Sequence, residues 1–151
     1  MALNRRQWIR AASLLGAAGA LTSFPLHLLG AARSAFEATQ VDDALGKLFG
    51  GKAVEESDRI SFQIPEIAEN GAVVPVSIST DLPDVKAISI VVDNNPNPLV
   101  ARFVIGPDAV ADVSARIKMG TSSRVRAFVE TRDRIYSTGR EVKVTIGGCG
   151  G

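Results

Sequence analysis

The feature that most restricts the fold of this chain is a two-residue hydrophobic alternation that recurs from residue 59 onward. Apolar side chains occupy every second position, with mostly polar residues between them, in segments 60–64, 74–79, 99–105, 113–119 and 124–130. Successive side chains of a strand point to opposite faces, so this pattern predicts strands with one buried face. Residues 85–92 form a more continuous apolar run, which is typical of a strand buried on both faces.

Turn signals separate these segments. Asn70-Gly71, the cluster 94–98 and Gly106-Pro107 each stop an alternating run. After Ile135-Tyr136, the residues Ser137-Thr138-Gly139 lead into a last apolar segment that ends at Ile146, which predicts a hairpin or a strand broken by a bulge. About seven strands at this spacing predict an all-β fold, an immunoglobulin-like antiparallel β-sandwich over residues 52–146.

A short helix is predicted before the strands, within a helical segment at residues 35–51. Its apolar stripe follows the i, i+4, i+7, i+8 pattern, with Val41, Leu45, Leu48 and Phe49. Acidic residues occupy the first turn and a Gly-Gly pair ends the pattern. A helix this short is marginal alone, so we expect it to dock either on its own domain or on a partner subunit.

The N-terminus has the pattern of an export signal. Arg5-Arg6 precede a weakly hydrophobic run over residues 11–29, and small residues follow at 30–35. The pattern resembles a twin-arginine (Tat) signal, so we expect residues 1–34 to be a signal peptide, with an approximate cleavage site, and the protein to reach the periplasm. The alternative is an N-terminal membrane anchor, which Pro25 and the many glycines disfavour.

Removal of residues 1–34 changes which chemistry is available. The remaining chain has 13 basic and 16 acidic residues, a net charge of −3, and it loses His27 and Trp8, the only residues of their types. Cys149 is then the one cysteine, which excludes a Cys–His pair, a thiolate or imidazole zinc site and an internal disulfide. We therefore expect no metal and no cofactor. An odd cysteine in an oxidising compartment indicates pairing between chains or a thiol kept for chemistry.

The cysteine lies in the C-terminal sequence Gly147-Gly148-Cys149-Gly150-Gly151. Glycine leaves the backbone unrestricted, so four of them around one thiol predict a flexible, thin arm rather than a packed active site. Three residues beyond Ile146 extend about 10 Å, enough for the sulfur to enter a narrow channel. No histidine or fixed cation activates the thiol locally. We expect a carrier without catalytic residues, not an enzyme.

Charge is unevenly distributed along the chain. Residues 35–115 hold 5 basic and 13 acidic residues, whereas residues 116–151 hold 8 basic and 3 acidic ones. The late basic residues either attract an anionic substrate or acidic partner, or are the solvated faces that alternating strands require; they are Arg116, Lys118, Arg124 and Arg126. The net charge and the few aromatic residues argue against nucleic-acid binding.

The C-terminal sequence 147–151 resembles the swinging arm of SoxY, the sulfur-carrier family of the Sox thiosulfate-oxidising system. The segment 64–76, which reads Ile-Pro-Glu-Ile-Ala-Glu-Asn-Gly-Ala-Val-Val-Pro-Val, is also similar to that family, as are Phe49-Gly50-Gly51 and the Tat-like signal. The resemblance covers essentially the whole chain.

The resemblance implies a function. Cys149 would be the covalent attachment site for thiosulfate-derived sulfur, and Gly147, Gly148, Gly150 and Gly151 would give the arm its flexibility. A Sox haem enzyme, a thiosulfohydrolase and a sulfur dehydrogenase would act on the adduct, and a SoxZ-like subunit would form a complex with this chain. The alternative from the residues alone is an exported β-sandwich interaction protein that uses Cys149 only for an intermolecular disulfide. A self-sufficient thiol enzyme is disfavoured by the missing histidine.

Overall fold

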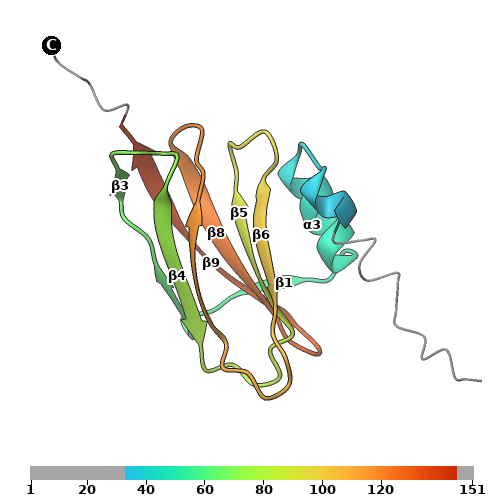
Figure 1. The fold of residues 1–151 in the computed structure, drawn as a ribbon. Helices are drawn as coiled ribbons and strands as arrows, with labels where there is room; N and C mark the ends of the chain where they lie inside the picture. Colours follow the sequence, from blue (N-terminus) through green and yellow to red (C-terminus); the bar gives the residue numbers. More distant parts are fainter. Residues whose placement is uncertain (1–32, 146–151) are drawn as a thin grey trace, which may run out of the picture.

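The computed structural model describes residues 33–145, which form two β-sheets packed face to face with a helix on one outer side (Figure 1). The larger sheet has the order β1-β9-β8-β5-β6, and β3 also pairs with β9. Its strands are β1 (Val54–Glu56), β3 (Ile67–Ala68), β5 (Ala87–Val92), β6 (Leu99–Val104), β8 (Ser123–Glu130) and β9 (Ile135–Val144). The smaller sheet has the order β2-β4-β7, with β2 (Ile60–Gln63), β4 (Val74–Thr80) and β7 (Asp112–Ile117).

The predicted all-β sandwich is confirmed, with three differences in detail. Nine strands are present in the described part of the chain rather than about seven, because the short β1 and β3 were not predicted. Both pair with β9 in parallel, whereas the other strand pairs are antiparallel. The predicted hairpin or bulge at Ser137-Thr138-Gly139 is wrong, since β9 runs unbroken through these residues and pairs with β8 in constant register.

The main core lies between the two sheets. It is formed by the inward side chains of both sheets, including Ile88, Ile90, Val125 and Val129 from the larger sheet and Val74, Val76 and Ile78 from β4. All six residues of β5 are buried, as predicted for a strand covered on both faces. The helix covers the face of β5 that points away from the main core.

Helix α3 (Val41–Phe49) packs on the outer face of the larger sheet, so it docks on its own domain (Figure 1). Its Ala44 and Phe49 belong to a second apolar cluster with Val91, Leu99, Phe128 and Ile135 from the strands below. The rings of Phe49 and Phe128 lie 5.5 Å apart in a tilted arrangement, the geometry that aromatic pairs prefer. Gly50 ends the helix in the left-handed conformation, with φ of 59°, and donates its N–H to the C=O of Gly46.

The chain changes sheet on either side of β2, and prolines set where it leaves. The last residue of β2, Gln63, lies opposite Ser77 of β4. Two residues further along, the antiparallel register brings β2 to Pro65 and β4 to Pro75, and Pro75 has no N–H for a partner strand. Pairing with β4 therefore stops, and the chain returns to β9 as β3.

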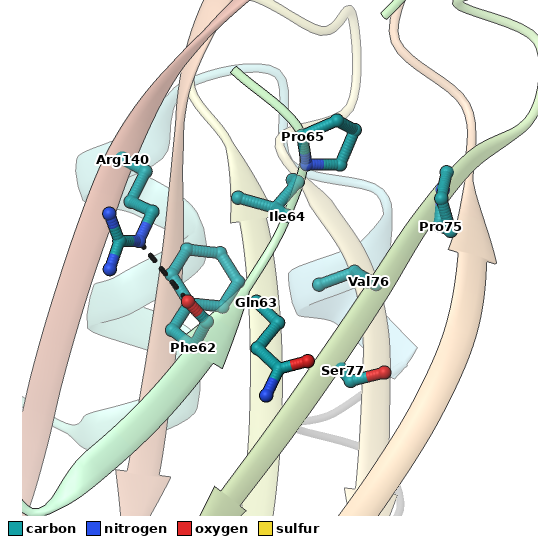
Figure 2. Close-up of a pocket in the computed structure, with 8 residues that line it drawn as sticks. All are labelled: Phe62, Gln63, Ile64, Pro65, Pro75, Val76, Ser77 and Arg140. Atoms are coloured by element: carbon teal, nitrogen blue, oxygen red, sulfur yellow. Dashed lines mark hydrogen bonds between the residues drawn. The ribbon is translucent and has the colours of Figure 1, made fainter. Parts of the chain in front are cut away.

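This change of sheet leaves a groove where the chain after β2 separates from β4, and Arg140 of β9 lies at one side of it. The groove has a volume of about 490 Å³ and is lined by Phe62, Gln63, Ile64, Pro65, Pro75, Val76, Ser77 and Arg140 (Figure 2). Nε of Arg140 on β9 donates to the backbone C=O of Phe62 on β2 at 3.1 Å. Arg140 thereby ties the two sheets together at a side where no strand joins them.

Candidate functional site: the root of the C-terminal arm

The five residues predicted to carry the function lie outside the described residues. These are Cys149 and the glycines Gly147, Gly148, Gly150 and Gly151, and the predicted signal peptide also falls almost wholly outside them. What the structure describes is the root of the arm, which is the C-terminal end of β9 up to Thr145. The positions of this root and of its supports are therefore the geometry available at the candidate site (Figure 1).

Hydrogen bonds donated by three backbone N–H groups hold the root on both edges of β9. On one side, Lys143 donates its N–H to the C=O of Glu66 at 2.8 Å, and Thr145 donates to the C=O of Ala68 at 3.0 Å. On the other side, just beyond the pair formed by Val142 and the first residue of β8, the N–H of Val144 donates to Oγ of Ser122 at 2.9 Å. The strand that precedes the arm is therefore anchored as far as Thr145.

Two asparagines fix the loop that supplies Ser122. Asn95 accepts from the N–H of Gly120 at 3.0 Å and donates from Nδ2 to the C=O of Lys118 at 2.7 Å. Asn94 donates from Nδ2 to the C=O of Ser122 itself at 2.9 Å. The turn between β5 and β6 thus holds the turn between β7 and β8, which in turn holds the end of β9.

Gly71 makes the closest approach at the root. Its C=O accepts from the N–H of Met119 at 2.7 Å. A Cβ added at Gly71 would lie 2.5 Å from the backbone oxygen of Met119 and 2.9 Å from a methyl of Val144. Only glycine lets the turn before β4 approach β9 this closely, so Gly71 supports the root by its lack of a side chain.

The late basic residues fall into two groups. Arg116, Lys118 and Arg124 are exposed and form no ion pair within residues 33–145. Arg126 instead pairs with Asp93 at 2.8 Å, and its guanidinium lies 5.6 Å from the centre of the Phe128 ring. The attraction of an anion or acidic partner therefore remains a prediction for the first three residues only, because Asp93 already neutralises Arg126.

The described residues offer no candidate metal site. Within residues 33–145 no group of three or more His, Cys, Asp or Glu side chains is placed to hold a metal ion. The carboxylate of Glu55 raises the pKa of Arg134 by hydrogen bonding and by charge, which leaves this exposed guanidinium cationic at every ordinary pH. None of the helices formed by the described residues is both long enough and apolar enough to cross a membrane.

Comparison with known proteins identifies the family. The family model described as "Sulfur oxidation protein SoxY" matches residues 45–149, which is more than two thirds of the chain. The chain belongs to the SoxY family. The match includes the predicted attachment residue Cys149.

One solved structure agrees with this assignment. The sulfur carrier protein SoxY from Chlorobium limicola f thiosulfatophilum has 40% sequence identity and a TM-score of 0.65, with 71% of this chain and 97% of that chain covered. The human F-spondin reeler domain matches with 10% identity and a TM-score of 0.47, over 62% of this chain and 95% of that chain. No curated protein matches the sequence. SoxY proteins are carriers rather than catalysts, and they work in the periplasm with SoxZ and the other Sox proteins.

Sequence reasoning did not find the residues that support the arm of this SoxY protein. Asn94 and Asn95 were assigned only to a turn, and Gly71 only to the turn before β4. Ser122 carries no signal in the sequence, because its role depends on β8 beginning one position later. The Asn-Asn-Pro-Asn-Pro composition of residues 94–98 was the available signal, since asparagine side chains often bond to neighbouring backbone groups.

Replacement of Gly71 by Ala is expected to lower the free energy of unfolding by about 1–3 kcal/mol, because the new Cβ collides with a backbone oxygen that cannot move independently. The strain should also raise amide hydrogen exchange at Val144 and Thr145. Urea denaturation and exchange measured by mass spectrometry would report both effects.

Gly46→Ala is the matched control for that substitution. Gly46 lies on the exposed side of α3 with no atom within 4 Å of an added Cβ. Alanine there should raise stability by up to about 1 kcal/mol through its better helix propensity. If both alanine variants change stability in the same direction, the close approach at Gly71 does not support the root.

Proposed function

We propose that this SoxY protein carries thiosulfate-derived sulfur covalently on Cys149 and presents it to separate Sox enzymes. The observation that carries the proposal is the anchoring of β9 on both edges up to Thr145. Cys149 follows four residues later, so its backbone can reach at most about 14 Å from this fixed point. A thiol on such a tether can enter a narrow active site while the sandwich remains outside.

In this scheme the partner enzymes supply all the groups that activate the Cys149 thiol. A haem enzyme of the Sox system would join the thiolate of Cys149 to the outer sulfur of thiosulfate, and the two electrons released would pass to the haem iron centres. A thiosulfohydrolase would then add water and release sulfate, which leaves a persulfide on Cys149. A sulfur dehydrogenase would oxidise that remaining sulfur. The chain itself holds no histidine in residues 35–151 that could act as a base.

The proposal also covers the cellular location of the protein and its partner subunit. Residues 1–34 would direct export by the Tat route, so that the folded carrier works in the periplasm. A SoxZ-like subunit would form a complex with the sandwich. The four glycines on the two sides of Cys149 would let the thiol turn to fit each enzyme in succession.

Intact-mass measurement tests the proposal. The protein is incubated with thiosulfate and its cognate haem enzyme, and the C-terminal peptide is then sequenced by mass spectrometry. We expect a thiosulfonate adduct on Cys149 and none in Cys149→Ser. Adducts that persist in Cys149→Ser would refute the assignment. A stoichiometric interchain disulfide with no adduct would instead establish Cys149 as a crosslink.

A further inference from the structure

Asn70 and Gly71 lie in the turn before β4, and the hydrogen bonds of this turn leave one backbone amide free. Oδ1 of Asn70 accepts from the N–H of Ala72 at 2.9 Å, and the backbone C=O of Asn70 accepts from the N–H of Val73 at 3.2 Å. The N–H of Gly71 donates no hydrogen bond within residues 33–145. Asn70 is exposed to solvent and Gly71 is partly exposed, so water reaches the turn.

These hydrogen bonds hold together two groups that can react with each other. The bond from Ala72 closes a ring of atoms that contains both Cγ of Asn70 and the backbone nitrogen of Gly71, so these two atoms stay close. The same bond polarises the side-chain carbonyl at the oxygen where negative charge develops when a nucleophile adds to Cγ. Gly71 has no Cβ to obstruct this approach.

We propose that Asn70-Gly71 is a site of spontaneous backbone modification at the root of the arm. The nitrogen of Gly71 bonds to Cγ of Asn70, the bond between Cγ and Nδ2 breaks, and ammonia leaves with the proton of the Gly71 amide. The product is a five-membered succinimide ring. Water then adds to either carbonyl of the ring and opens it to aspartate or isoaspartate, and no oxidant or reductant takes part.

The other asparagines of the described chain lack this arrangement. Asn95 and Asn97 precede prolines, whose nitrogens carry no proton to lose. Asn94 precedes the N–H of Asn95, which donates to the C=O of Val92 at 3.2 Å. Among the asparagines within residues 33–145, only Asn70 precedes an N–H that makes no hydrogen bond there.

The modification would disturb the root because Gly71 has no room to move. The C=O of Gly71 accepts from the N–H of Met119 at 2.7 Å, and one carbon added to Gly71 would lie 2.5 Å from the oxygen of Met119 and 2.9 Å from a methyl of Val144. In isoaspartate the main chain passes through the former side chain and gains one carbon, which displaces Gly71 from this contact. Aspartate adds a charge but keeps the length of the backbone, so it leaves the contact in place.

Peptide mapping of aged protein tests the site. The purified protein is incubated in mildly alkaline buffer, folded and in parallel unfolded in urea, and mass spectrometry measures the gain of about one dalton and the isoaspartate content at each asparagine. We expect conversion at Asn70 at least about tenfold faster than at Asn94, since orientation of the reacting groups is worth more than this factor. Conversion at Asn70 should be at least as fast in the folded protein as in urea. Conversion of Asn94 at a comparable rate, or protection of Asn70 by folding, would overturn the proposal.

Two variants separate ring formation from its effect on the root. Asn70→Gln keeps the carboxamide, but its longer side chain cannot close a five-membered ring with Gly71, so the position should remain unmodified. Asn70→Asp, measured on fresh protein, has the charge of the product with the parent backbone. Amide exchange at Val144 and Thr145 should rise severalfold in the isoaspartate fraction and stay near the parent rate in Asn70→Asp.

Unchanged exchange in the isoaspartate fraction, or an equal rise in Asn70→Asp, would refute the displacement of Gly71. Rapid conversion of the glutamine in Asn70→Gln would refute the five-membered ring. None of these experiments uses a residue of the arm, so their failure would leave the proposed chemistry of Cys149 unaffected.

Discussion

Deletion of Gly147 and Gly148 is expected to lower enzyme-catalysed adduct formation on Cys149 by at least about a hundredfold, because misplacement of a reacting atom by about 1 Å already costs that much. Two residues span about 7 Å of extended chain, which is half of the reach beyond Thr145. The thiol would then stop short of a recessed active site. The measurement is the rate of thiosulfate-dependent adduct formation with the haem enzyme, followed by intact mass.

A small thiol reagent supplies the internal control for this experiment. Its reaction with Cys149 should remain within about twofold of the parent rate, since an exposed thiol reacts in proportion to its thiolate fraction and access. Replacement of both glycines by alanine keeps the arm at full length and separates reach from flexibility. A deletion variant that forms adducts at the parent rate would show that the enzymes take the thiol close to the sandwich.

Much of the sandwich was predictable because its strands follow a simple rule of burial. In β2, Ile60 and Phe62 are buried while Ser61 and Gln63 are exposed, and the alternation in the sequence shows this directly. The continuous apolar run of β5 correctly predicted burial on both faces. The sequence left open whether the short helix docks on its own domain or on a partner subunit. The structure shows that α3 packs on the outer face of β5 in the same domain.

The features that were missed depend on contacts between distant segments. β1 and β3 are too short to show any period, and their parallel pairing with β9 exists only because β2 leaves for the other sheet. Gly139 was taken as a turn signal, but it lies in the middle of β9. A Cβ at Gly139 would lie 3.0 Å from Nε of Arg124 and 3.1 Å from Cγ of Arg126, so close side-chain packing accounts for the glycine.

The candidate site likewise has a part that is visible in the sequence and a part that depends on distant contacts. The lone cysteine and its glycines are a local pattern, and the sequence alone identified them, although their chemistry stays a prediction. The support for the arm is not local, since Ser122, Gly71 and Glu66 come from three separate connections between strands, which meet only in the folded sandwich. No spacing along the chain relates these residues to Val144 or to Cys149.

Replacement of Phe128 by Ala is expected to lower the free energy of unfolding by about 3–5 kcal/mol, the usual cost of emptying a buried phenylalanine site. Phe128 is only 2% exposed, and it joins α3 to the larger sheet through its contact with Phe49. A domain of this size is stable by only about 5–15 kcal/mol, so the variant should be marginal. Urea denaturation followed by circular dichroism measures the loss.

The same substitution distinguishes docking of α3 from general loss of core packing. If Phe128 is the main anchor of α3, amide exchange in residues 41–49 should increase more than exchange in β4, which lies in the other sheet and belongs to the main core. Val104→Ala is the control, because Val104 is 81% exposed and its loss should change stability by less than about 0.5 kcal/mol. Equal destabilisation of α3 and β4 would mean that the helix and the sandwich unfold as one cooperative unit. An unfolding free energy within about 1 kcal/mol of the parent would contradict the role of Phe128 altogether.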